Sequence, residues 1–147
     1  MAETKYGKYI VTEPKFPKGV TPPSIPPEKR TGEVILVSDN EVIEGAFYLN
    51  CALIWKASDR GSPGGSHTHD WDEYIGFIGS NPEDPHNLFG EVEITLGDEI
   101  HTLIKSCAVF VPKGLSHCPV VFKRVDRPIF YFSTGPRSVY DKEQHTE

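Results

Sequence analysis

Positive charge is scarce in this chain of 147 residues, and this limits what the chain can bind. There are 15 lysine and arginine residues against 21 aspartate and glutamate residues, so the formal net charge at pH 7 is −6. Neutralisation of phosphates by basic side chains supplies much of the affinity for nucleic acids, so the charge balance argues against a nucleic-acid partner. A small molecule is the more natural partner.

Long apolar runs and closely paired cysteines are also missing. No run approaches the roughly 18 apolar residues of a membrane-spanning helix, and the N-terminal residues lack the apolar segment of a secretion signal. We therefore expect a cytoplasmic protein without a membrane partner. The odd set Cys51, Cys107 and Cys118 favours thiols over a disulfide framework. The length fits one domain.

Proline is concentrated in one segment. Six prolines fall between Pro14 and Pro27, a composition that favours extended backbone and removes amide donors. We therefore predict an N-terminal arm over residues 1–32, a main domain over 33–133 and a polar tail over 134–147. The arm is either a loosely attached tail or a segment that wraps its own domain or a second subunit.

The main domain carries the signals of strands rather than of helices. Its apolar segments are short, rich in Val, Ile, Phe and Tyr, and each ends at Gly, Pro, Asp or Ser. They cover residues 33–39, 46–58, 73–79, 90–96, 99–104, 107–112, 119–124 and 128–133. No intervening segment holds a helical period for as much as 11 residues. The pattern predicts an all-β sandwich or barrel.

The clearest hairpin is formed by residues 90–104 around a Gly97-Asp98 turn. Apolar and polar residues alternate before the turn, as in a half-buried strand. A two-residue turn pairs Ile94 with His101, and this register places His101 on the inward face.

Two histidines stand two residues apart in the segment GGSHTHDWDEYI, residues 64–75. In an extended strand His67 and His69 face the same side, and a continuing strand brings Glu73 to that side and turns Asp70 and Asp72 away. Two histidines and one carboxylate on one face are typical of non-haem metal sites. Taken alone, the His-x-His pattern is more typical of histidines with ordinary hydrogen-bond partners than of a metal site.

A second motif further along the chain changes this interpretation. Gly61, the His67–His69 segment and Glu73 together resemble the first signature of the cupin superfamily, and PKGLSH at 112–117 resembles the second. The resemblance covers about residues 33–133 and implies an all-β fold, the double-stranded β-helix or jelly-roll barrel. The chain departs from the usual signatures at three positions that are not ligands: Ser80, Ser106 and Val121.

The resemblance implies that one divalent metal ion is bound by His67, His69, Glu73 and His117. Nitrogen and oxygen donors suit Fe, Mn, Ni, Co or Zn, and four ligands on an octahedral ion leave two positions open. We therefore expect an enzyme that acts on an oxygen-bearing small molecule as a dioxygenase, an isomerase or a lyase. The alternatives are a non-catalytic, metal-dependent small-molecule-binding cupin and a structural or storage protein.

Three further expectations concern the catalytic side chains, Cys118 and the oligomeric state. Tyr48 and an inward His101 are the candidate catalytic side chains, since a tyrosine can hold a polar substrate group and a histidine can transfer a proton. Cys118 follows His117 in an extended strand and is expected to point away from the metal. Apolar barrel edges and the proline-rich arm predict a homodimer.

Overall fold

The computed structural model describes residues 4–16, 24–61, 65–136 and 143–144 of the chain. Within these residues there are ten strands and two short 3₁₀ helices, η1 (Gly7–Tyr9) and η2 (Pro27–Lys29). Neither helix has the length and apolar character needed to cross a membrane. The all-β prediction for the main domain is confirmed.

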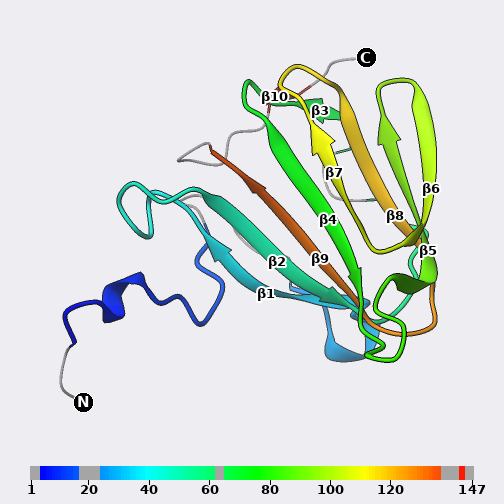
Figure 1. The fold of residues 1–147 in the computed structure, drawn as a ribbon, viewed down its shortest axis with the longest axis horizontal. Helices are drawn as coiled ribbons and strands as arrows, with labels where there is room; N and C mark the ends of the chain where they lie inside the picture. The colour runs from blue at the N-terminus through cyan, green and yellow to red at the C-terminus, as the bar shows by residue number, and fades with distance from the viewer. Residues whose placement is uncertain (1–3, 17–23, 62–64, 137–142, 145–147) are drawn as a thin grey trace.

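The strands form two antiparallel sheets of five strands each (Figure 1). The first sheet has the order β1 (Gly32–Ser38), β2 (Tyr48–Ile54), β9 (Ile129–Gly135), β4 (Glu73–Gly79) and β7 (Cys107–Val111). The second sheet has the order β10 (Glu143–Gln144), β3 (His67–Thr68), β8 (His117–Val125), β5 (Asn87–Leu96) and β6 (Glu99–Lys105). From β2 onward, the chain changes sheet at every connection except the β5–β6 hairpin. This winding is that of a double-stranded β-helix, as predicted.

The apolar core lies between the two sheets. Ile75 and Phe77 of β4 face Leu88, Val92 and Ile94 of β5, and each of these side chains is at most 2% exposed. The alternation along β5 buries every second residue from Leu88 to Ile94, as expected of a strand with one face on a core. Full burial of each large apolar side chain contributes roughly 1.5–3 kcal/mol.

The β5–β6 hairpin has the predicted register, but its histidine does not face the interior. Ile94 pairs with His101 across the Gly97-Asp98 turn. The His101 side chain is nevertheless 47% exposed, and its Nε2 lies 2.9 Å from Oε1 of Glu99. β6 is the outermost strand of the second sheet, so the first sheet does not cover it, and all its residues except Leu103 are exposed. The prediction of an inward His101 is wrong.

The described part of the proline-rich arm contacts its own domain. Pro14 forms a parallel bridge with Val37 of β1, and the Lys15 amide donates a hydrogen bond of 2.9 Å to the Val37 carbonyl. Arm residues 1–3 and 17–23 lie outside the described residues.

The described part of the tail also adds to the sheets. β9 continues to Gly135, two residues past the expected end of the main domain, and β10 pairs with β3. Residues 137–142 and 145–147 of the tail lie outside the described residues.

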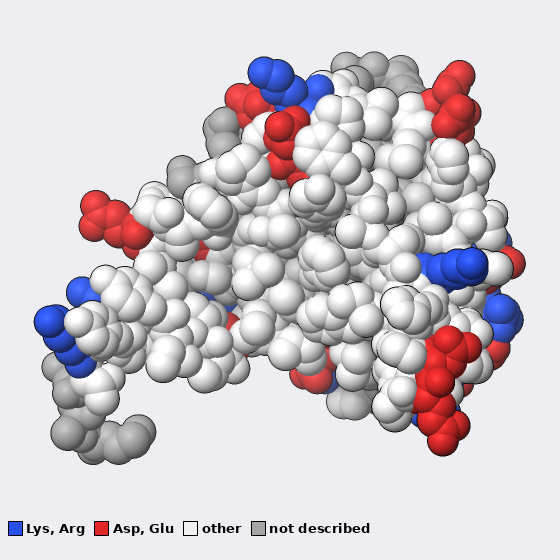
Figure 2. All heavy atoms as spheres, in the orientation of Figure 1, with Lys and Arg blue, Asp and Glu red and all other residues white. Residues whose placement is uncertain are grey.

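The outer face of the first sheet carries a group of exposed apolar side chains. Those that are more than 40% exposed are Phe47, Tyr74, Ile78 and Phe110. Figure 2 shows this face with uncharged atoms over its centre and Lys, Arg, Asp and Glu mainly around its border. We call these four residues the outer apolar face.

Candidate metal centre

The four predicted ligands come from both sheets and meet between them. His67 of β3 and His117 of β8 are directly paired in the second sheet, while Glu73 is the first residue of β4 in the first sheet. His69 lies in the connection between β3 and β4. All four residues are at least nine-tenths buried, with exposures of 1–6%.

Three of the predicted ligands, His69, Glu73 and His117, have donor atoms close together, whereas His67 forms a second group with His117 and Cys118. The ring centroids of His67, His69 and His117 are 4.4–5.0 Å apart. Glu73 Oε1 lies 3.0 Å from His117 Nε2 and 3.5 Å from His69 Nε2. The potential ligand atoms of His69, Glu73 and His117 all lie within 4.8 Å of one another.

Two of the histidines are oriented by backbone carbonyls. Nδ1 of His67 lies 3.0 Å from the Gly65 carbonyl, and Nδ1 of His117 lies 2.9 Å from the Leu115 carbonyl. A carbonyl oxygen only accepts, so Nδ1 carries a proton in both rings, and Nε2 is the nitrogen that each ring would offer to a metal. Such a contact fixes the tautomer and ring orientation of a histidine that binds a metal through its other nitrogen.

Two donor atoms of the cluster are buried without a well-formed hydrogen bond. Despite their separation of 3.0 Å, neither Glu73 Oε1 nor His117 Nε2 has a hydrogen bond of acceptable geometry. Burial by itself raises the pKa of Glu73, but the contacts with His117 and His69 outweigh it and hold this pKa below its usual value. Buried polar atoms are costly without partners, so a divalent ion among these donors fits the site.

The two sequence motifs are joined by backbone hydrogen bonds. The Gly114 amide donates to the His69 carbonyl at 2.8 Å, and the Lys113 amide donates to Asp72 Oδ1 at 2.9 Å. Gly114 has a φ of +84°, a left-handed conformation that glycine adopts without steric cost. The turn before His117 is thereby held against the segment that carries the other ligands.

Glu73 reaches the site by a different path from the one predicted. β3 ends at Thr68, the chain bends at Asp70 and Trp71, and a new strand begins at Glu73 in the opposite sheet. The expected continuous strand is therefore wrong, although Asp70 and Asp72 are exposed as predicted. The crossing between sheets brings a carboxylate to face the histidines rather than to lie beside them.

Two aromatic side chains border the cluster. The Trp71 ring stacks on His69 with centroids 4.3 Å apart and contacts Tyr48 edge-on at 5.8 Å. The Tyr48 hydroxyl lies 3.1 Å from Ser133 Oγ. Burial raises the pKa of Tyr48 to about 12, with Glu73 adding to the rise, so its phenol is neutral and able to donate a hydrogen bond.

A row of polar side chains on the first sheet continues from Tyr48. Asn50 of β2 pairs with Ser133 of β9, and Tyr131 stands two residues before Ser133 on the same face. Oδ1 of Asn50 is buried, and burial raises the pKa of Tyr131 well above 10.0. Sequence reasoning missed Asn50, Ser133 and Trp71, because a polar residue inside a strand gives no local sign of facing a site.

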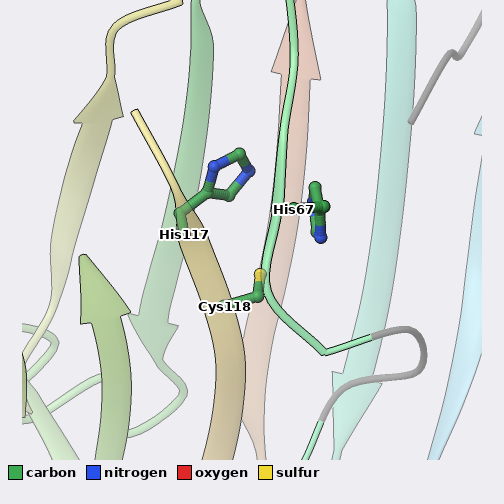
Figure 3. A group of neighbouring side chains, drawn as sticks. All are labelled: His67, His117 and Cys118. Atoms are coloured by element: carbon green, nitrogen blue, oxygen red, sulfur yellow. The ribbon is translucent and has the colours of Figure 1, made fainter. Parts of the chain in front are cut away.

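Cys118 points toward the cluster, contrary to the prediction. Its Sγ and potential ligand atoms of His67 and His117 all lie within 4.8 Å of one another. Figure 3 shows its side chain on the same side of β8 as the His117 ring. Strict alternation holds for extended backbone, whereas Cys118 has a φ of +75°, which turns its side chain to the side of its neighbour.

No protein-family model and no curated protein matches this chain. Solved structures similar to it include KdgF from Halomonas sp., 20% identical over 72% of this chain and 77% of that protein, with a TM-score of 0.43. A cupin-superfamily sugar phosphate isomerase from Silicibacter pomeroyi is 14% identical over 73% of this chain and 60% of that protein, with a TM-score of 0.48.

A third similar structure is an uncharacterized protein with a double-stranded beta-helix domain from Klebsiella pneumoniae. It is 13% identical over 82% of this chain and 91% of that protein, with a TM-score of 0.47. These neighbours are cupin-type proteins, as are others among the similar structures. Identities this low concern the fold and say nothing of the ligand or reaction of this chain.

Proposed function

We propose that the chain binds one divalent transition-metal ion through His67, His69, Glu73 and His117. The observation that carries this proposal is the burial of three imidazoles and one carboxylate beside one another, with possible ligand atoms of His69, Glu73 and His117 within 4.8 Å of one another. Two donor atoms of the group, Glu73 Oε1 and His117 Nε2, have no hydrogen bond of acceptable geometry. Nitrogen and oxygen donors of this kind suit Fe, Mn, Ni, Co or Zn.

We further propose that the ion and the polar row beside it hold an oxygen-bearing small molecule. When bound, a divalent ion supplies Lewis-acid or redox chemistry to an oxygen ligand. Tyr48 and Tyr131 have raised pKa values, so both can donate hydrogen bonds to a second oxygen of the molecule. The proposed activity is that of a dioxygenase, an isomerase or a lyase.

One observation favours the non-catalytic alternative. His101 lies on an exposed edge strand, and Tyr48 and Tyr131 are held neutral. His101 is therefore too far out to accept a proton from a molecule at the metal, and the two neutral phenols are poor bases. A protein that binds a metabolite through its metal, without turning it over, needs no separate base.

Metal content tests the proposed ligands. Protein purified without chelators should contain one transition-metal ion per chain, and His67→Ala should contain far less. His101→Ala is the matched control, since it removes an exposed imidazole from a strand edge. Equal metal in the wild type and in His67→Ala would overturn the ligand assignment.

The metal that is found directs the test of the reaction. If the ion is iron, uptake of oxygen with small catechols or diketones would identify a dioxygenase. Conversion of sugar phosphates or elimination from small acids, with any of the metals, would identify an isomerase or a lyase. No turnover, together with a rise in thermal stability on addition of one of these compounds, would favour the binding alternative.

We also propose that the chain forms a homodimer through the outer apolar face. A chain with a net charge of −6 repels a second copy, and this repulsion is weakest across a face with few charges. Part of this face is hollowed, with Phe47, Tyr74 and Phe110 among the lining residues. Two-fold pairing would bury the hollows of both copies against each other.

Sedimentation velocity tests the proposed dimer. The wild type should sediment as a dimer, and Tyr74→Glu should sediment as a monomer because it places a buried, unpaired charge at the interface. Ile100→Glu is the matched control, since it changes an exposed apolar residue on β6, outside the outer apolar face. A monomeric wild type would refute the proposal.

A further inference from the structure

The cluster contains a sulfur donor as well as nitrogen and oxygen donors. His67, His117 and Cys118 form one group of possible ligand atoms within 4.8 Å of one another, and His69, Glu73 and His117 form another. The two groups overlap at His117. His117 therefore lies next to both the sulfur donor and the Glu73 carboxylate.

The environment of Cys118 is that of a site rather than of apolar packing alone. Cys118 is 6% exposed and forms no disulfide. Its Sγ lies near the rings of His67 and His117 (Figure 3). Independently of the cysteine, the buried Oε1 of Glu73 and Nε2 of His117 lack acceptable hydrogen bonds at the same place, which points to a bound cation there.

The backbone around Cys118 is held in the conformation that turns the thiol inward. Ser66 Oγ donates a hydrogen bond of 2.9 Å to the Cys118 carbonyl, which connects β8 to the residue just before β3. β3 and β8 are also joined by the pairing of His67 with His117. The sulfur and the two imidazoles therefore belong to one rigid pair of neighbouring strands.

We infer that Cys118 is a direct metal ligand and adds a thiolate to the centre. This inference rests on the metal binding proposed above and extends it. On binding, the S–H bond of Cys118 breaks, a sulfur–metal bond forms and the proton passes to solvent. A thiolate favours Zn, Co, Ni and Fe(II) over harder ions such as Mn(II). The site is therefore expected to prefer these ions to Mn(II) more strongly than three histidines and a glutamate alone would.

X-ray absorption of the zinc-loaded protein tests the inference, because it identifies the atoms bound to the metal. A thiolate ligand places a sulfur scatterer at about 2.3 Å from zinc, whereas histidine and carboxylate ligands lie at about 2.0–2.2 Å. The sulfur scatterer should be present in the wild type and in Cys51→Ser, the control at a second buried cysteine. It should be absent from Cys118→Ser.

Relative affinities separate ligation from a packing role. Cys118→Ser should weaken zinc binding on the order of tenfold or more, as expected for loss of a ligand, and leave Mn(II) binding within about twofold of the wild type. An equal loss of both metals would show that Cys118 only supports the fold, and would overturn the inference.

The possible failures are distinguishable. One zinc ion per chain with only nitrogen and oxygen scatterers would overturn the role of Cys118 and leave the proposed metal centre standing. If the wild type bound no zinc and no Mn(II), the proposed metal centre itself would be overturned, together with this inference.

Discussion

Tyr48→Phe removes a single hydroxyl from the wall of the proposed site and so tests the chemistry of that wall. Tyr48 is 6% exposed, and its hydroxyl lies 3.1 Å from Ser133 Oγ. Loss of a hydrogen bond of this kind costs about 1 kcal/mol. At pH 7 the variant should therefore be less stable than the wild type by about 1 kcal/mol.

At alkaline pH the order of stability should reverse. Burial raises the pKa of Tyr48 from 10.0 to about 12, so the folded state holds the neutral phenol more strongly than the unfolded state does. The stability linked to the neutral phenol is complete below pH 10 and is lost as the pH rises toward 12. Two pH units, at about 1.36 kcal/mol each, amount to about 2.7 kcal/mol.

These two quantities predict a crossing of the stability curves. Near pH 11 the wild type has lost about half of the 2.7 kcal/mol, which offsets the hydrogen bond that the variant lacks. Above this pH, Tyr48→Phe should be the more stable protein. Urea unfolding of metal-free protein at several pH values, followed by tryptophan fluorescence, measures both curves.

The control for this experiment is Tyr9→Phe, which removes an exposed phenol outside the outer apolar face. Its unfolding free energy should follow the pH profile of the wild type. If the difference between Tyr48→Phe and the wild type stays constant from pH 7 to pH 12, then Tyr48 is not the buried, neutral donor that the proposed function requires.

Three shorter predictions follow from other contacts. Gly76→Ala places a Cβ against the Phe132 ring and should lower the unfolding free energy by about 1–3 kcal/mol, measured by urea unfolding. Zinc at about 100 times its Kd should stabilise the wild type by about 2.7 kcal/mol, which is roughly 5–10 °C in Tm. EDTA should reverse this shift, and His117→Ala should show neither the shift nor its reversal. Asp72→Ala removes the acceptor of the Lys113 amide, so calorimetry should show zinc affinity lowered on the order of tenfold while the one-to-one stoichiometry is retained.

Local patterns were sufficient for the strands and for much of the register. The alternation on β5 and the Gly97-Asp98 turn fixed the pairing of Ile94 with His101, because turn length and side-chain alternation are local properties. The same reasoning failed for the exposure of His101. Whether a face is covered depends on the opposite sheet, and β6 extends beyond that cover.

The prediction for Cys118 failed for another reason. Alternation assumes extended backbone, and the positive φ of this residue turns its side chain inward. Glycine is the residue that usually marks a positive φ in a sequence. Here the residue is a cysteine, so the sequence carries no local signal of this conformation. Glu73 faces the site as predicted, although the chain changes sheets on the way.

Anomalous scattering at the zinc absorption edge, from crystals grown with zinc, would locate the ion that His67, His69, Glu73 and His117 are proposed to bind. One strong peak per chain is expected between the two sheets, at about 2.0–2.2 Å from a nitrogen of each histidine and an oxygen of Glu73. A peak only at exposed side chains such as His101 and Glu99, with none at the buried cluster, would contradict this ligand assignment.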